Sequence, residues 1–303
     1  MIKGAGTGAC PYDQMASGFQ RIAILGTGLI GGSFGLAVRR ALPDARVAGW
    51  DRADVLKAAA ARGAIEVAVT ELEEAVADAD LVYVALPAGA TLDALPQVAR
   101  HAAQGALVTD ACSIKANIVR AAAEHFRSGA CFLGGHPLAG KETAGVEHAD
   151  AELFRGTRYA LIAAKENADP RVARFAGLLA AIGAEPVWLN AEAHDRAVAF
   201  ISHLPQLAAV ALAGVLRDAT DHSGLPLMLA GPGARDTLRL AGSPYALWRD
   251  ICLANRENIA AAMDQMMQAL DHLRAQLASR ELQEEFDGAN EVYKILRQIN
   301  QAS

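Results

Sequence analysis

The chain has 303 residues, of which 52% are hydrophobic and 20% charged, so it favours two folded domains and excludes a disordered chain. There are 28 Lys and Arg against 34 Asp and Glu, a net charge of −6, which argues against a nucleic-acid-binding surface. No apolar run reaches the roughly 18 residues of a membrane span, and the first twenty residues lack an apolar signal segment, so we expect a cytoplasmic protein without a membrane partner.

Residues 1–19 are expected to form a flexible tail, followed by a domain over 20–190 in which short β-rich runs alternate with Ala-rich helical patterns. The expected strands are 21–25, 46–50, 81–86, 106–109, 131–134, 158–163 and 185–189. The expected helices are 29–42, 53–61, 71–77, 90–103, 114–126 and 170–181. Apolar strands that alternate with helices predict an α/β fold with a doubly wound parallel sheet.

The remaining residues, 191–303, carry helical patterns and no strand pattern. The expected helices are 191–217, 226–240, 245–278 and 281–300. The stretch from Ala197 to Leu216 is apolar almost all round, which predicts burial on every side. Pro205 lies within it and removes a backbone donor, so we expect a kink over 201–205. We therefore predict an all-α dimerisation domain and a homodimer formed through it.

A glycine-rich turn follows the first expected strand directly. Gly26 permits a tight turn, Gly28 lets the backbone approach a pyrophosphate, and Gly31 lets the next helix pack closely. Backbone N–H groups at the start of that helix favour bound phosphate. The expected cofactor-binding residues of this turn are Gly26, Thr27, Gly28, Leu29, Ile30 and Gly31. The pattern predicts a Rossmann-type dinucleotide site.

An acidic residue at the end of the second expected strand supports the same site. Asp51 lies 25 residues after Gly26, where a carboxylate accepts hydrogen bonds from the ribose hydroxyls and favours NAD. Arg52 beside it can instead accept a 2′-phosphate, so NADP stays open. Leu86 and Pro87, at the end of a later strand pattern, are expected to contact the cofactor as well.

Two polar turns follow the strand patterns 106–109 and 131–134, and both are expected at the carboxyl ends of strands, where ligands bind. The second turn holds His136 between glycines, where an imidazole can accept a proton near neutral pH. Ser113, in the first turn, can orient that histidine or contact the nicotinamide. We predict that His136 and Ser113 are catalytic.

Five motifs together resemble the prephenate/arogenate dehydrogenases of tyrosine biosynthesis: GTGLIGGS, DACSIK, GGHPLAGKE, SHLPQ and ARDTLRLAGSPYALWRDICLANRENI. The resemblance covers about residues 20–300. It implies an NAD(P) domain followed by a helical dimerisation domain. It also implies oxidative decarboxylation of a cyclohexadienol, which gives 4-hydroxyphenylpyruvate from prephenate or tyrosine from arogenate, with CO2.

The resemblance also implies roles for single residues. His136 matches the family's catalytic histidine, Ser113 the serine that supports it, and Arg239 the arginine that grips a substrate carboxylate. Asp236 is expected on the same helix face as Arg239, where it would hold that arginine. The other substrate-binding candidates are His203 and Glu142. His203 contacts either the backbone group freed by Pro205 or the substrate. Glu142 either gates the pocket or is a solvated carboxylate.

One departure from the family pattern bears on the substrate. Gln206 stands where many members that use prephenate have a histidine that meets the substrate's side chain, so prephenate and arogenate both remain open.

Other residues are not expected in the site. Trp248 and the methionines at 263, 266 and 267 are expected in the core, and His194 and Asp195 in the first turn of the long helix. The eight histidines show no metal-binding spacing, so no metal is expected. A β-hydroxyacid or imine reductase would need a lysine within 191–217, and none is present there. A non-catalytic NAD-binding protein would bind the nucleotide without turnover.

Overall fold

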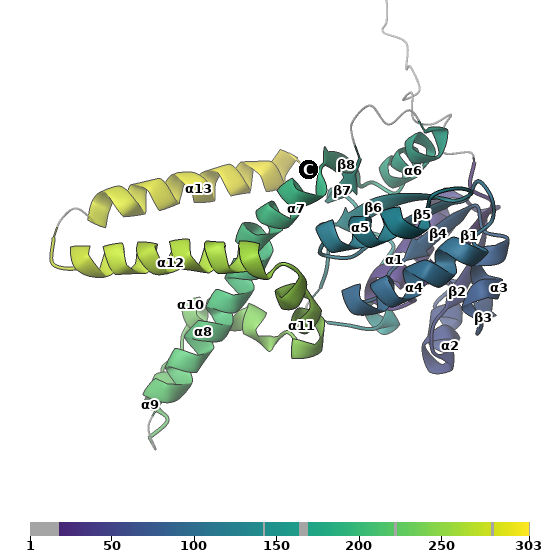
Figure 1. Ribbon diagram of the computed structural model, residues 1–303. Helices are drawn as coiled ribbons and strands as arrows, with labels where there is room; N and C mark the ends of the chain where they lie inside the picture. Colours follow the sequence, from purple (N-terminus) through teal and green to yellow (C-terminus); the bar gives the residue numbers. More distant parts are fainter. Residues whose placement is uncertain (1–17, 142, 164–168, 221–222, 280–281, 303) are drawn as a thin grey trace, which may run out of the picture. The chain divides into compact units, whose positions relative to one another are not determined.

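The computed structural model describes residues 18–141, 143–163, 169–220, 223–279 and 282–302. The flexible tail expected over 1–19 and the candidate Glu142 therefore lie wholly or almost wholly outside the described residues. The chain divides into two compact units (Figure 1). The first contains the chain up to Asp195 together with Pro244–Ala254, and the second contains Arg196–Ser243 and the chain from Asn255 onward.

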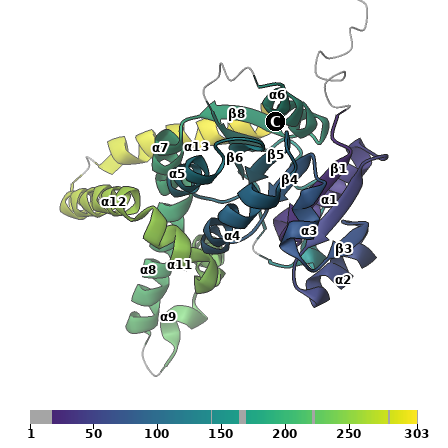
Figure 2. The same ribbon diagram turned by 45° about the vertical axis from the view of Figure 1, so that its right-hand side comes forward.

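The first unit is a sheet with helices on both faces (Figure 2). Its strands are β1 (Arg21–Leu25), β2 (Arg46–Trp50), β3 (Val67–Val69), β4 (Leu81–Val84), β5 (Leu107–Asp110), β6 (Cys131–Pro137), β7 (Arg158–Ile162) and β8 (Glu185–Leu189). Its helices are α1 (Leu29–Ala41), α2 (Ala53–Ala61), α3 (Leu72–Ala77), α4 (Ala88–His101), α5 (Ala116–His125), α6 (Pro170–Ala181) and α11 (Tyr245–Ala254), and α7 (Ala191–Val198) begins in it. Strand β3 is an addition to the expected set.

The eight strands lie in the order β3-β2-β1-β4-β5-β6-β7-β8. Neighbours are parallel except β6 and β7, which pair antiparallel with His136 opposite Ala160. The expected parallel, doubly wound sheet is therefore confirmed except at this pair of strands. Parallel strands need a long crossover, usually a helix, whereas the described part of the β6–β7 connection holds only the 3-10 turn Val146–His148.

Apolar side chains fill both faces of the sheet. Strands β4 and β5 are buried throughout, as a central strand covered by helices must be. On one face Phe34 of α1 stacks on Tyr83 of β4, with ring centroids 3.8 Å apart and planes within 7°. On the other face Val82 packs with Val98 of α4. This rigid core fixes the carboxyl ends of β1, β4 and β5, where the polar turns lie.

The second unit is helical. Its elements are the rest of α7, a π-helical turn (Ala199–His203), α8 (Leu204–Ala219), α9 (Leu225–Met228), α10 (Pro232–Leu238), a 3-10 turn (Arg239–Gly242), α12 (Arg256–Gln276) and α13 (Leu282–Ala302). The irregularity expected over 201–205 takes the form of the π-helical turn, which ends just before Pro205. The single helix expected over 245–278 is wrong, because Asn255 separates α11 from α12.

Much apolar surface of the second unit is exposed within this one chain. Val215 of α8 is 64% exposed, so the single chain does not supply the burial expected for this helix. The methionines at 263, 266 and 267 are 38–54% exposed, so their expected place in the core is wrong for the single chain. Residues 191–219 also form a helix that is long and apolar enough to cross a membrane by length and composition, with a hydropathy of 1.7 and 28% of that window buried. The expectation that no apolar segment is long enough to span a membrane is therefore wrong by this criterion.

Candidate active site

The turn between β1 and α1 has the geometry that its glycines predict. Gly26 has a φ of +89°, and a Cβ there would lie 2.5 Å from the carbonyl oxygen of Ala85. A Cβ at Gly31 would lie 1.9 Å from the carbonyl oxygen of Gly26, whereas one at Gly28 would meet nothing within 4 Å. Two glycines are thus required by packing, and the third leaves open space beside the N-terminus of α1, where an incoming phosphate needs it.

The acid at the end of β2 is bonded to the glycine turn. Asp51 Oδ2 accepts a hydrogen bond from the backbone N–H of Thr27 at 2.7 Å, and its Oδ1 accepts one from the N–H of Arg52 at 2.8 Å. The Arg52 side chain is exposed and lies 3.8 Å from Asp54. The structure therefore brings the turn, Asp51 and Arg52 together at the carboxyl ends of β1 and β2.

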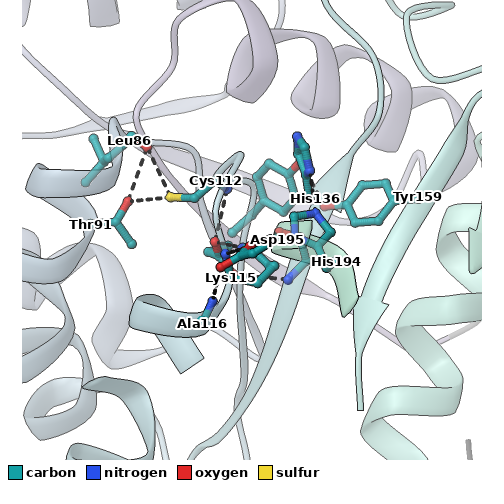
Figure 3. Close-up of polar contacts among 12 residues, drawn as sticks. Leu86, Thr91, Cys112, Lys115, Ala116, His136, Tyr159, His194 and Asp195 are labelled. Carbon is teal, nitrogen blue, oxygen red and sulfur yellow. Dashed lines mark hydrogen bonds and ion pairs between the residues drawn. The ribbon is translucent and has the colours of Figure 1, made fainter. Parts of the chain in front are cut away.

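The two remaining cofactor candidates lie beside the same turn. A Cβ at Gly26 would be 2.9 Å from the side chain of Leu86, so Leu86 lies against the turn. Pro87 precedes the first residue of α4 and offers no side-chain cap to it. The Leu86 carbonyl accepts hydrogen bonds from Thr91 and Cys112, at 3.2 Å and 3.6 Å (Figure 3). Burial raises the pKa of Cys112 to about 12, so its thiol is neutral and is not a nucleophile.

The catalytic candidate His136 lies within β6, because pairing with β7 extends the strand to Pro137. The turn expected around His136 is therefore wrong. His136 is half-buried, and its Nδ1 lies 2.9 Å from Nε2 of His194 on α7 (Figure 3). The two rings have centroids 5.1 Å apart and planes at 73°. One ring nitrogen of the candidate base is thus engaged by a second histidine.

The sequence predictions left His194 and Asp195 outside the site, whereas the structure places His194 against His136 and Asp195 against His194. His194 lies in the first turn of α7, as expected, and Asp195 follows it; both are buried. His194 Nδ1 lies 2.8 Å from Asp195 Oδ1. The one sequence signal that could have indicated their role is the adjacent His-Asp pair near the start of α7, the helix that follows β8. Its link to His136 spans 58 positions in the chain, and no local pattern reports such a contact.

Asp195 also caps helix α5. Its two oxygens accept hydrogen bonds from the backbone N–H groups of Lys115, at 2.7 Å, and Ala116, at 2.8 Å. Burial raises the pKa of Asp195, but the hydrogen bonds from His194, Ala116 and Lys115 outweigh it and hold the pKa below its usual value. The carboxylate is therefore ionised at neutral pH and can only accept hydrogen bonds.

A buried ion pair fixes the strand that carries His136. The Lys115 ammonium pairs with the Asp110 carboxylate and also donates to the Gly135 carbonyl at 2.7 Å. Asp110 in turn accepts from the backbone N–H of Gly135 at 3.0 Å. Both charged side chains are fully buried and paired, as buried charges must be. Ser113 lies half-buried in the same loop, and its support of His136 stays a prediction.

The substrate candidates of the second unit lie on several elements. His203 is buried and its Nδ1 lies 3.2 Å from Nδ2 of Asn255. Gln206 is buried on α8, and its Nε2 donates to the carbonyl of Leu240 at 2.8 Å. The side chain of Gln206 is thereby anchored one residue after Arg239, which opens the 3-10 turn.

Asp236 lies on α10, which ends at Leu238, and Arg239 opens the 3-10 turn that follows directly. That Asp236 holds Arg239 stays a prediction.

The comparisons with known proteins cover both units. Residues 34–187 match the nucleotide-binding domain model of prephenate dehydrogenase, and residues 190–294 match its dimerization domain model. The chain is 33% identical to the prephenate dehydrogenase of Lactococcus lactis subsp. cremoris over 266 residues, 87% of this chain and 73% of the relative. It is 30% identical to the cyclohexadienyl dehydrogenase of Zymomonas mobilis over 265 residues, 87% of this chain and 90% of that protein.

A solved structure leads to the same family. The crystal structure of prephenate dehydrogenase from A. aeolicus, in complex with hydroxyphenyl propionate and NAD+, matches with a TM-score of 0.83 and 28% identity. The match covers 93% of this chain and 98% of that one. The two family models together span well over half of the sequence, and His136 lies within the first of them and His194 within the second. This chain belongs to the prephenate dehydrogenase family.

Proposed function

We propose that this chain catalyses the NAD-dependent oxidative decarboxylation of prephenate to 4-hydroxyphenylpyruvate and CO2, a step of tyrosine biosynthesis. The observation that carries the proposal is the position of His136. It lies in the same unit as the glycine turn and Asp51, and its Nδ1 is engaged by His194 at 2.9 Å. A base of this kind is what the loss of a hydroxyl proton requires.

The residues at the glycine turn fit a dinucleotide. In this proposal the open space at Gly28 receives the pyrophosphate, which the N–H groups of Leu29 and Ile30 bind as free donors of the first turn of α1. Asp51 accepts from the ribose hydroxyls, which favours NAD over NADP. When bound, the nicotinamide supplies the hydride acceptor.

The chain's own residues then act on the substrate. His136 takes the proton of the ring hydroxyl while hydride leaves the ring carbon that carries this hydroxyl. Loss of the ring carboxylate as CO2 then makes the ring aromatic. Ser113 supports the base or the cofactor. Arg239 binds a substrate carboxylate, where a guanidinium forms paired hydrogen bonds.

Arogenate is the second candidate substrate, and Gln206 is the observation that favours it. Gln206 replaces a histidine, and its amide nitrogen is used by the Leu240 carbonyl, so no cation is offered at this position to a pyruvyl carboxylate. Proteins named for each substrate resemble this chain: the prephenate dehydrogenase of L. lactis and the arogenate dehydrogenase of Synechocystis.

Steady-state kinetics with prephenate and with arogenate, each with NAD and with NADP, test the proposal. We expect formation of NADH at 340 nm with prephenate and NAD, at a higher kcat/KM than with any other pair. A higher value with arogenate would move the assignment to the second candidate. Nucleotide binding without turnover of either compound would favour a non-catalytic NAD-binding protein.

We also propose that the protein is a cytoplasmic homodimer formed through the second unit, with no membrane or nucleic-acid partner. The exposed apolar side chains of α8, α12 and α13 support this, since a monomer rarely exposes so much apolar surface. The family describes this part of the chain as its dimerization domain. Burial of His203 and Gln206 in the helix over 191–219 also favours a protein partner over lipid.

A further inference from the structure

We propose that Asp195 and His194 are positioning residues that hold His136 in one tautomer and share the proton it accepts. The inference rests on the proposed role of His136 as the base. Its evidence is the chain of contacts from Asp195 Oδ1 to His194 Nδ1, 2.8 Å, and from His194 Nε2 to His136 Nδ1, 2.9 Å (Figure 3).

The donor and acceptor of each hydrogen bond in this chain of contacts can be assigned by starting from Asp195. Asp195 already accepts from two backbone N–H groups, and an ionised carboxylate can only accept. His194 therefore carries its proton on Nδ1 and, as a neutral ring, has its lone pair on Nε2. That lone pair accepts from Nδ1–H of His136. His136 is then the Nδ1–H tautomer, in which Nε2 is the atom that accepts a proton.

Of the charged groups around the two imidazole rings, Asp195 is the one whose negative charge acts on them. His194 is 1% exposed and Asp195 3%, so water competes little for their hydrogen bonds. From the neighbouring strand and loop, the Asp110 carboxylate and the Lys115 ammonium neutralise each other. From β4 and β7, Tyr83 and Tyr159 stay protonated, because burial raises the pKa of both phenols.

The proton step balances within these three side chains. The substrate hydroxyl proton passes to Nε2 of His136 while the Nδ1 proton of His136 passes to Nε2 of His194. His194 then carries protons on both nitrogens and its positive charge lies beside the Asp195 carboxylate. Return of the proton to solvent restores the starting tautomers. No oxidant or further reactant enters this step.

The arrangement also predicts how the base is switched off. A proton added to the pair at low pH occupies either Nε2 of His136 or the bond between the rings, and in both cases the pair can no longer accept the substrate proton. The Asp195 carboxylate lies 2.8 Å from His194 Nδ1 and stabilises the positive charge of the protonated pair. Loss of the carboxylate's charge must move the acidic limb of the kcat/KM profile to lower pH.

Nuclear magnetic resonance of the 15N-histidine-labelled enzyme without substrate tests the tautomer directly. We expect His136, identified by the loss of its signals in His136→Asn, to be the Nδ1–H form. His194→Phe removes the acceptor and should release His136 to a mixture of tautomers. His194→Gln keeps an acceptor oxygen near the same place and should retain the Nδ1–H form. An Nε2–H tautomer in the wild type, or no change in His194→Phe, would overturn the proposal.

Kinetics separate the two parts of the proposal. His194→Phe should lower kcat about 10- to 100-fold, a part of the 10²–10⁴ that a general base contributes. His194→Gln and Asp195→Asn should shift the acidic limb to lower pH, while the control Glu192→Gln, exposed on the same helix, should leave it in place. An unmoved limb in Asp195→Asn would refute proton sharing. Because the tautomer measurement needs no turnover, failure of the proposed function remains distinguishable from failure of this inference.

Discussion

At the scale of single residues, the candidate residues of the first and of the second unit differ in how they are held. Asp51 is bonded to the backbone of the turn it serves, so sequence and geometry agree there. Arg239 instead begins a short 3-10 turn and is exposed in the single chain. The Gln206 side chain anchors the next residue of that turn. Asp51 is therefore fixed directly by the turn that it is proposed to serve, whereas the backbone beside Arg239 is fixed by a side chain of α8.

Substitution of the base should affect the chemical step more than binding. His136→Asn should lower kcat by roughly 10²–10⁴, because an amide cannot take the hydroxyl proton. The dissociation constant of NAD, measured by fluorescence titration, should stay the same. His125→Asn, on the exposed side of α5, is the matched control. A His136→Asn enzyme with wild-type turnover would show that another group is the base.

Substitution of the ribose acid should change the choice of nucleotide. Asp51→Ala should lower the ratio of kcat/KM for NAD to that for NADP by about 10-fold or more, since a hydrogen bond to a charged group contributes about 1.5–3 kcal/mol. Asp54→Ala, three residues later and exposed, should leave the ratio as it is. If Asp51→Ala also leaves it as it is, the ribose role of Asp51 is wrong.

Loss of the guanidinium should appear in KM. Arg239→Ala should raise the KM for prephenate by roughly 10- to 100-fold with a smaller effect on kcat, because a charge-assisted contact to substrate is lost. Arg235→Ala removes a neighbouring exposed arginine on α10 and should have little effect. Equal KM values for the two variants would place the carboxylate contact elsewhere.

At the scale of elements, helix α11 supports α4, the helix that follows Leu86 and Pro87. Asp250 Oδ2 accepts from the backbone N–H of Gly89 at 3.2 Å, in the first turn of α4, which has no side-chain cap of its own. Ile251 packs with Leu95 of α4 and Ile118 of α5. A carboxylate at a helix N-terminus is stabilising, so α11 holds the start of α4 beside Leu86 and Pro87.

Removal of this cap should weaken both stability and nucleotide binding. Asp250→Ala should cost about 0.5–2 kcal/mol of stability, the usual value of an N-cap, and should raise the dissociation constant of NAD. Arg249→Ala breaks the ion pair with Asp250 but leaves the cap in place, so it should bind NAD normally. Thermal melts and NAD titrations of both variants provide the measurement. Unchanged binding in Asp250→Ala would limit the cap to stability.

The elements that the sequence predicted correctly are those with local signals. The glycine turn and β1, β2 and β8 have apolar runs or turn residues that need no distant partner. Strand β3 has only three residues at the sheet edge, too few for a pattern. The extension of β6 to His136 arises from pairing with β7, and the start of α5 at Ala116, not residue 114, coincides with the cap from Asp195. Both depend on residues far along the chain.

At the scale of the whole molecule, the apolar helices of the second unit predict the oligomeric state. Ile295→Glu in α13 places a charge on an apolar side chain that is 55% exposed in the single chain. It should shift the protein from dimer to monomer in analytical ultracentrifugation, since burial of an unpaired charge is costly. Asn290→Glu places the same charge at a polar position of α13 and should remain dimeric. A wild-type monomer at micromolar concentration would contradict the proposed dimer.

The path of the chain through α11 has a consequence for any attempt to dissect the enzyme. The chain leaves the first unit after Asp195, returns for Pro244–Ala254 and leaves again. A fragment that stops at Asp195 would lack Ile251 and Asp250, leaving Leu95 and Ile118 uncovered. Chimeras between family members that exchange only the N-terminal segment would likewise join α4 to a foreign α11. A transplantable nucleotide module must therefore carry this helix with it, for example through a linker that replaces residues 196–243.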